Sequence, residues 1–149
     1  MGTQNVLLVE DNDDDIELTQ RSFGKLSLPH RVTVARDGIA ALDYLFGDEL
    51  AARPKSEFPA LILLDLKLPK MDGFGVLERI RSEESTRFTP VVILTTSAEI
   101  KDRLESYRLG ANSYIRKPMN FDHFIEAVSQ LGTYWLTLNL LAPDEPVLR

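Results

Sequence analysis

Cysteine is absent from the 149 residues of the chain, which excludes disulfide bonds and every form of thiolate chemistry. Long hydrophobic runs are also missing, since no stretch approaches the roughly 20 apolar residues that a membrane-spanning helix needs. The N-terminal residues lack the basic start and the small-residue cleavage site of a secretory signal peptide. We therefore expect a cytoplasmic protein that makes no contact with a membrane.

Positive charge is scarce relative to negative charge. The chain has 17 Lys and Arg residues against 23 Asp and Glu residues, a formal net charge of -6. A negative overall field repels a nucleic-acid backbone, and the sequence has no stripe of Lys and Arg of the kind that nucleic-acid binders carry. We therefore expect no binding to nucleic acid, and we expect metal cations or basic protein surfaces as partners.

Strand-like and helix-like patterns alternate along the chain. Short runs of branched apolar residues are typical of strands that are buried on both faces, and residues 31–35 alternate as an edge strand does. The expected strands are 5–9, 31–35, 60–64, 91–94 and 113–115. Apolar residues at helical spacing follow each strand, and Asp37, Asp72 and Asn120 stand at N-cap positions. Five such units predict an α/β fold with one parallel sheet and helices on both faces.

Polar residues directly follow four of the expected strands. They are Glu10, Asp11, Asp65, Thr95, Thr96 and Lys117. In an open parallel sheet the functional residues gather at the carboxyl ends of the strands, so this topology brings the set into one cleft.

The chemistry of these side chains indicates a site that binds a cation and an anion next to each other. Carboxylates that share a cleft repel one another unless a proton or a cation neutralises them. Oxygen ligands without His or Cys favour a hard ion such as Mg²⁺, while a lysine and hydroxyl groups can hold an anion. This combination suits a phosphoryl group in transfer, and a carboxylate can itself be the nucleophile that becomes an acyl phosphate.

Four sequence motifs resemble those of a known family. In order, VLLVEDN, LILLDLKLPKMDG, VVILTTS and YIRKP resemble the receiver domain of two-component response regulators, over roughly residues 5–131. The resemblance implies a flavodoxin-like fold with strand order 2-1-3-4-5, in which Asp65 accepts a phosphoryl group from a histidine kinase. The stretches EDNDDDIELT and GTYWLTLNLLAP look like those of the single-domain regulators that pair with phytochrome-type kinases of cyanobacteria and other bacteria.

The resemblance also implies how a Mg²⁺ ion is held. Asp11, Asp65 and the main-chain carbonyl of Lys67 would ligate the ion directly, and Glu10 would hold it through water. The chain departs from many close relatives at Lys67, where they carry a carboxamide. Because that side chain would lie near the path of the attacking water, we expect an altered rate of dephosphorylation.

For the phosphoryl group itself, the resemblance implies four more roles. Thr95 would bond it through its hydroxyl, Thr96 through its backbone N–H, and Lys117 would pair with its oxygens. Tyr114 would be the switch residue, turning inward when Thr95 is drawn to the phosphoryl group. The family also implies a cis peptide bond between Lys117 and Pro118.

Other polar residues near these motifs have simpler interpretations. Asp13, Asp14 and Asp15 could extend the metal site, but acidic residues also stabilise a helix N-terminus, and we expect them to face solvent. His30 and His123 lack a ligand partner at a useful spacing, so we expect both to be surface or cap residues.

The C-terminal residues have more apolar side chains than a receiver core requires. We divide the chain into a receiver domain, residues 1–131, and a C-terminal extension, residues 132–149, and expect Gly132 to break or kink the helix between them. Trp135 and Leu138 continue the apolar stripe of the last helix, whereas Leu136 lies off it. A helix that is apolar on several sides needs a second surface. We expect a homodimer built around Tyr134, Trp135, Leu138 and Leu141.

Three functions compete for this set of residues. We expect a phosphorylation switch that is not an enzyme and that signals through protein contacts, since no output domain follows the receiver. A phosphohydrolase of the haloacid-dehalogenase type needs a second Asp where Lys67 stands. Flavin binding on this fold needs a loop that holds phosphate after the first strand, and the acidic EDNDDD loop would repel a phosphate group. An adaptor that does not use phosphorylation would not need the intact set of cleft residues.

Overall fold

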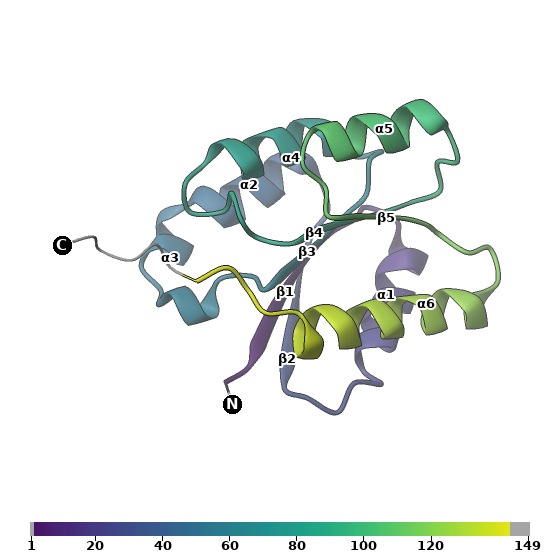
Figure 1. Cartoon of the computed structure of the whole chain (residues 1–149), viewed down its shortest axis with the longest axis horizontal. Coiled ribbons are helices and arrows are strands. Elements are labelled where there is room, and N and C mark those ends of the chain that lie inside the picture. Colours follow the sequence, from purple (N-terminus) through teal and green to yellow (C-terminus); the bar gives the residue numbers. More distant parts are fainter. Residues whose placement is uncertain (1, 144–149) are drawn as a thin grey trace.

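The computed structural model describes residues 2–143 and places its five strands in one parallel sheet. The strands are β1 (Gln4–Val9), β2 (His30–Ala35), β3 (Leu61–Leu64), β4 (Val91–Thr95) and β5 (Ser113–Arg116). Their order across the sheet is β2-β1-β3-β4-β5 (Figure 1). The predicted flavodoxin-like fold and its strand order are therefore confirmed.

Helices cover both faces of the sheet (Figure 1). One face is covered by α1 (Asp13–Phe23) and α6 (Phe121–Thr133), and the other by α2 (Gly38–Phe46), α4 (Gly73–Ser82) and α5 (Ile100–Arg108). The predicted polar connection before β3 contains α3 (Asp48–Ala51) and a 3₁₀ turn (Lys55–Glu57). Within residues 2–143, no helix has the length and apolarity needed to cross a membrane.

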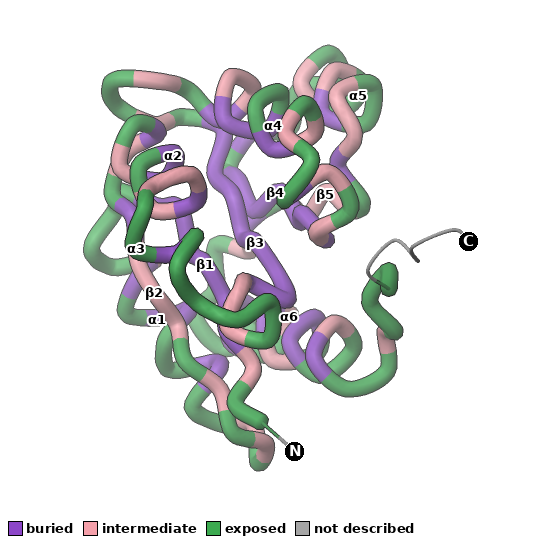
Figure 2. The backbone as a smooth tube through the Cα atoms, turned by 90° about the vertical axis from the view of Figure 1, so that its left-hand side faces the viewer, coloured by how far each residue is buried: buried purple, intermediate pink, exposed green. Residues whose placement is uncertain are grey.

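The core consists of two apolar layers, one on each face of the sheet. Successive side chains of a strand point to opposite faces, so Leu7 and Val9 pack toward α2 and α4, whereas Val6 and Leu8 pack toward α1 and α6. The central strands β3 and β4 are buried along their whole length, and β1 is buried from Asn5 onward (Figure 2), as their apolar runs predict. β2 is half-buried, as expected for an edge strand.

Helix caps fix the loops at the carboxyl edge of the sheet. The side-chain oxygens of Asn12, Asp37, Asp72 and Asn120 each accept a hydrogen bond from the backbone N–H three residues further on. Three of these caps were predicted, and Asn12 is an addition. Such caps satisfy N–H groups that have no partner within the helix, and thereby set where each helix begins.

The start of α4 lies against the backbone that follows β3. The N–H of Gly73 donates a 2.8 Å hydrogen bond to the carbonyl of Leu66. A Cβ atom at Gly73 would overlap with the carbonyl oxygen of Asp65 and lie 2.7 Å from the Cα of Leu66. A glycine is therefore required for α4 to approach the Asp65 backbone this closely.

The chain continues in helical form beyond Gly132, so the prediction of a break at this residue is wrong. Gly132 is buried, and a Cβ atom there would lie 3.0 Å from the side chain of Leu26 and 3.1 Å from that of Phe23. The glycine permits close packing of α6 on α1 instead of ending the helix.

A π-helical turn, Tyr134–Leu138, follows α6 and changes which side chains face the core. Its Asn139 N–H donates to the Tyr134 carbonyl at 2.8 Å, five residues back, so one extra residue enters the turn. Leu136 is consequently buried and Leu138 is 71% exposed, the reverse of the predicted stripe. The last part of the expected extension, residues 144–149, lies outside the described residues.

Candidate functional site

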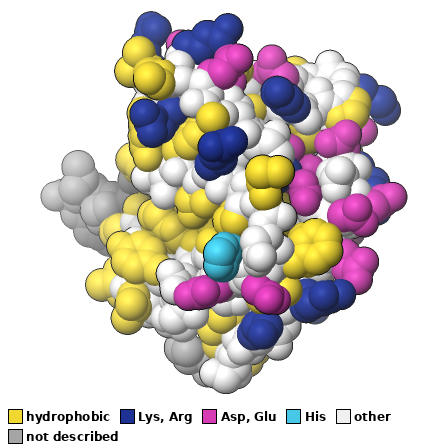
Figure 3. Space-filling view, turned by 90° about the vertical axis from the view of Figure 1, so that its right-hand side faces the viewer, with side chains coloured by type: hydrophobic (Ala, Val, Ile, Leu, Met, Phe, Trp, Pro, Cys, Tyr) yellow, Lys and Arg dark blue, Asp and Glu magenta, His cyan; other side chains and the backbone are white. Residues whose placement is uncertain are grey.

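A cleft of about 610 Å³ lies at the carboxyl edge of the sheet. Figure 3 views this side of the molecule, where acidic side chains gather along one part of the face and hydrophobic side chains along another. The loops after β1, β3, β4 and β5 all contribute to the cleft. The residues that line it include Glu10, Asp11, Asp15, Asp65, Thr96 and Lys117.

Lys117 is the central charge of the cleft. Its Nζ lies 2.6 Å from Glu10, 2.7 Å from Asp15 and 3.1 Å from Asp65, and its side chain is only 5% exposed. Burial by itself would lower the pKa of the ammonium group, but the hydrogen bonds to Asp15 and Glu10 and the charge of Asp65 raise the pKa above its ordinary value. Lys117 is therefore held as a cation.

The peptide bond between Lys117 and Pro118 is trans, so the prediction of a cis bond is wrong. The trans form is favoured by about 0.5–1 kcal/mol even before proline. The lysine is aimed by other contacts here, because its backbone N–H donates to the Thr95 carbonyl at 2.7 Å and its ammonium group is tied to three carboxylates.

The two carboxylate oxygens of Asp65 have different partners. Oδ1 accepts hydrogen bonds from the backbone N–H groups of Leu66, at 2.7 Å, and Lys67, at 3.4 Å. Oδ2 accepts from Lys117, and the residue as a whole is 8% exposed. The carboxylate is thus fixed in orientation, with the Lys67 main chain beside it and the Lys67 side chain exposed.

Glu10 and Asp11 complete an acidic cluster with Asp65. Each of the three residues offers a carboxylate oxygen, and these oxygens lie within 4.8 Å of one another. Burial raises the pKa of Glu10 to about 7, the negative charge of Asp65 adds to this effect, and Lys117 opposes it. The cluster has only oxygen donors and an excess of negative charge, so it fits a hard divalent cation.

Thr95 and Tyr114 contact the same neighbour, Ser97, outside the acidic cluster. Thr95 is completely buried at the end of β4, and its Oγ1 accepts a hydrogen bond from the Ser97 N–H at 3.3 Å. The hydroxyl of the half-buried Tyr114 donates to the Ser97 carbonyl at 3.0 Å. Thr96, by contrast, is exposed on the cleft. The predicted switch residues are therefore linked through the loop after β4.

Asp15 was expected to face solvent, and this expectation is wrong. Asp13 does lie at the surface, paired with Arg36, and Asp14 is exposed, but Asp15 turns inward to Lys117. Spacing along α1 carries the missed signal. Asp15 precedes the buried residues Leu18, Thr19 and Ser22 by three, four and seven positions, which places it on the core-facing side of the helix.

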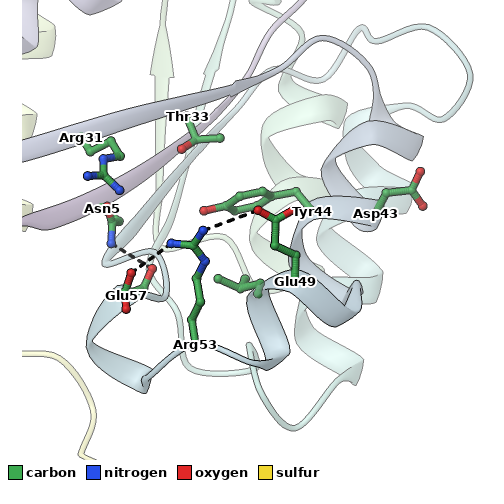
Figure 4. A pocket seen from close by; sticks show the side chains of 9 residues that line it. Asn5, Arg31, Thr33, Asp43, Tyr44, Glu49, Arg53 and Glu57 are labelled. Atoms are coloured by element: carbon green, nitrogen blue, oxygen red, sulfur yellow. Dashed lines mark hydrogen bonds and ion pairs between the residues drawn. The ribbon is translucent and has the colours of Figure 1, made fainter.

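A second hollow, of about 260 Å³, lies at the amino-terminal edge of the sheet (Figure 4). Its two arginines are Arg31 and Arg53, and the guanidinium group of Arg53 pairs with Glu57 at 3.1 Å and with Glu49 at 3.5 Å. Asn5 donates to the Glu57 carbonyl at 2.9 Å. The ion pairs of Arg53 hold the connection before β3 together, and the hydrogen bond of Asn5 ties it to β1, so these contacts have a structural role.

Comparison with known proteins places these features in a family. Residues 6–129 match the response regulator receiver domain. The chain is 37% identical over 131 residues to the response regulator Rcp1 of Synechocystis, covering 88% of each chain. It is 42% identical over 134 residues to a probable methanogenesis regulatory protein, FilR2, of Methanothrix harundinacea, covering 90% of this chain and 84% of that one.

Solved structures agree with the sequence comparison. The phosphorylated cyanobacterial phytochrome response regulator RcpA superimposes with a TM-score of 0.88 at 38% identity, covering 95% of this chain and all of that one. The Mn²⁺-bound form of Rcp1 gives a TM-score of 0.82 at 35% identity, with 94% and 99% covered. Receiver domains bind a divalent metal ion, which agrees with the acidic cluster.

The fold, the acidic cluster with its lysine, and these similarities lead to one conclusion. The chain belongs to the response regulator receiver domain family of signalling proteins, in which a histidine kinase is the phosphoryl donor, and its relatives include response regulators of phytochromes.

Proposed function

We propose that this receiver takes a phosphoryl group from the phosphohistidine of a histidine kinase onto Asp65. The N–P bond of the donor breaks, a bond forms between phosphorus and a carboxylate oxygen of Asp65, and the imidazole leaves. The observation that carries the proposal is the buried contact between Asp65 Oδ2 and Lys117 Nζ at 3.1 Å, beside two further carboxylates. The fixed cation supports the proposal because it would pair with oxygens of the phosphoryl group.

Mg²⁺ is the ion that we propose for the acidic cluster. Asp11, Asp65 and the main-chain carbonyl of Lys67 would ligate it, with Glu10 holding it through water. The bound cation would neutralise charge on the carboxylates and on the phosphoryl oxygens. The carboxylates of Glu10, Asp11 and Asp65 support this assignment because they offer only hard oxygen donors within 4.8 Å of one another.

The remaining residues of the cleft would orient the phosphoryl group and change their hydrogen bonds when it is present. We propose that Lys117 pairs with its oxygens, that the Thr96 N–H donates to it, and that the Thr95 hydroxyl is drawn toward it. The Thr95 hydroxyl would then leave the Ser97 N–H, and the Tyr114 hydroxyl, which bonds the Ser97 carbonyl, would respond through the same loop. Tyr114 is accordingly the proposed switch.

The proposed partners are proteins. We propose a phytochrome-type histidine kinase as the donor, supported by the similarity to RcpA and Rcp1. We propose that the protein acts in the cytoplasm through protein contacts and that it neither catalyses the turnover of an external substrate nor binds nucleic acid. Its net charge of -6 supports the last point.

We further propose a homodimer that buries the C-terminal apolar side chains. Tyr134, Leu138 and Leu141 are 47%, 71% and 48% exposed. Trp135 is half-buried against the core, and its ring meets the Tyr134 ring edge-on, with the ring centroids 5.0 Å apart. Tyr134 and Leu138 line one shallow hollow beside Leu26, and exposed apolar patches of this kind mark interfaces. The proposed extension, residues 132–149, would then serve assembly through these side chains, while its Gly132 and Leu136 pack in the core.

Phosphorylation of the intact chain tests the central proposal. The protein is incubated with Mg²⁺ and phosphoramidate, and the intact mass is measured, with Asp65→Asn and a sample containing EDTA as controls. We expect one labile phosphoryl adduct, absent from both controls. No adduct, or an adduct that survives in Asp65→Asn, would contradict the proposal. Transfer from phytochrome kinases in light and in darkness then tests the proposed donor.

A further inference from the structure

We propose that Asp15 is a positioning residue for phosphoryl transfer, and that it acts by holding the ammonium group of Lys117. The inference rests on the proposed function of Asp65. Asp15 Oδ2 lies 2.7 Å from Lys117 Nζ, a shorter distance than the 3.1 Å to Asp65 Oδ2. The Asp15 side chain is 22% exposed, so the ion pair lies at the edge of the buried cluster.

The hydrogen-bond donors of Lys117 show why a second anchor matters. An ammonium group has three N–H donors, and Glu10, Asp15 and Asp65 each accept one of them. When Asp65 Oδ2 becomes an acyl phosphate oxygen, the donor that it held becomes free for a phosphoryl oxygen. The other two contacts can persist, so the ammonium group stays in place while one donor changes its acceptor.

Asp15 suits this task because its own position is fixed. Its backbone N–H donates to the Asn12 side chain at 2.9 Å, which locks the first turn of α1. Glu10, the other anchor, is also the proposed partner of the metal through water. Asp15 is therefore the anchor of Lys117 that belongs to a helix and lies outside the proposed metal site.

Fixing a lysine in advance should accelerate transfer. The lysine side chain has four rotatable bonds, and ordering it at the moment of reaction carries an entropic cost. A side chain that is already ordered avoids this cost in the transition state. The two neighbouring aspartates do not share the role, because Asp13 pairs with Arg36 and Asp14 is exposed.

The test compares Asp15→Ala with the matched control Asp14→Ala, which removes the same charge from the same turn of α1. The rate of Asp65 phosphorylation is measured with phosphoramidate at saturating Mg²⁺. We expect Asp15→Ala to be slower by about tenfold, the order of one charge-assisted hydrogen bond, and Asp14→Ala to stay within about twofold of the native rate. Thermal unfolding establishes that both variants are folded.

A double-mutant cycle separates a positioning role from a structural one. If Asp15 acts through Lys117, then Asp15→Ala has no further effect in a Lys117→Ala background, whereas a general effect on α1 persists there. Equal rates for Asp15→Ala and Asp14→Ala, a faster Asp15→Ala, or additive effects in the cycle would overturn the inference while leaving Asp65 as the acceptor. If the native chain takes no phosphoryl group at all, the proposed function and this inference both fail.

Discussion

At the residue scale, the site is governed by an imbalance of charge. The ammonium group of Lys117 is in contact with three carboxylates, and Asp11 adds a fourth to the same cleft. One cation cannot neutralise four anions, so the cleft gains stability from a proton or a second cation. Burial is the main cause of the raised pKa of Glu10, and the charge of Asp65 adds to it. The proposed Mg²⁺ site follows from the imbalance of charge.

The first prediction concerns the pH dependence of the metal-free protein. The pKa of Glu10 is raised by burial to about 7, above its ordinary value of 4.5, so the folded protein binds the proton more tightly than the unfolded chain does. The resulting stabilisation is complete below pH 4.5 and is lost as the pH rises through 7. The loss amounts to at most about 3 kcal/mol in the free energy of unfolding.

Urea unfolding in EDTA between pH 5 and pH 8 measures this effect. We expect the native protein to lose stability across this range relative to Glu10→Gln, which cannot titrate, and we expect Mg²⁺ to remove the difference. Parallel pH profiles for the two proteins in EDTA would show that Glu10 does not carry the proton.

The second prediction concerns Lys67, the residue that departs from many relatives. An ammonium group only donates hydrogen bonds, whereas a carboxamide oxygen can accept one from the attacking water and orient it toward phosphorus. We therefore expect Lys67→Asn to shorten the lifetime of the acyl phosphate, by at least about threefold. The lifetime is followed by intact mass after removal of the donor.

Lys70→Asn is the control for this change, because Lys70 is also an exposed lysine of the loop after β3 and has a positive φ that asparagine tolerates. The acyl phosphate of Lys70→Asn should have the same lifetime as that of the native protein. A Lys67→Asn lifetime that is unchanged or longer would contradict the prediction.

The sequence predicted the members of the site better than their contacts. Asp65, Glu10, Asp11 and Lys117 follow strand ends, and a parallel sheet brings strand ends together whatever the details. The contact of Asp15 with Lys117 depends on the phase of α1, which the cap at Asn12 fixes. The acidic run itself has no apolar residue, so its phase shows only in the buried residues further along α1, and two of the three that share the side of Asp15 are polar, Thr19 and Ser22.

At the element scale, the sequence predicted which segments are strands and helices, but less well which faces are buried. Ile100, Leu104 and Tyr107 recur at helical spacing, yet they are 72%, 60% and 48% exposed. A helical apolar pattern indicates burial without saying whether the core or a partner provides it. At the end of α6 the π-helical turn exchanged Leu136 and Leu138, because one added residue rotates every later side chain.

The third prediction tests the contact between α4 and the Asp65 backbone. A methyl group at Gly73 would overlap with the Asp65 carbonyl oxygen, which can move only if the loop after β3 moves. We expect Gly73→Ala to lower the free energy of unfolding by about 2 kcal/mol and to slow the phosphorylation of Asp65. Chemical unfolding and the phosphoramidate assay measure the two effects.

Gly75→Ala, on the same turn of α4, is the matched control. Its nearest new contact, at 2.9 Å, is the Cγ atom of the Met71 side chain, which is flexible. The variant should therefore be close to native in both assays. Similar losses for Gly73→Ala and Gly75→Ala would mean that the helix start, and not the contact with Asp65, is sensitive.

At the scale of the whole molecule, one edge of the sheet carries the functional site and the other has a structural role. The carboxyl edge holds the acidic cleft and its lysine, and the amino-terminal edge holds the ion pairs of Arg53. After its π-helical turn the chain continues from the end of α6 toward α3 (Figure 1). α6 therefore connects the loop of Lys117, at one edge of the sheet, with the exposed Leu138 at its other end.

The last prediction distinguishes two surfaces on which a dimer could form. Leu138, in the π-helical turn, is 71% exposed, and Ile100, on α5, is 72% exposed, so a change to glutamate at each tests one surface with matched chemistry. We expect the native protein to sediment as a dimer, Leu138→Glu to weaken the dimer by at least about tenfold, and Ile100→Glu to leave it intact. Truncation after Leu131 would be a poorer test, because it also removes the buried Leu136 from the core. Dissociation by Ile100→Glu alone would move the interface to α5, and a native monomer at all concentrations would contradict the proposed dimer.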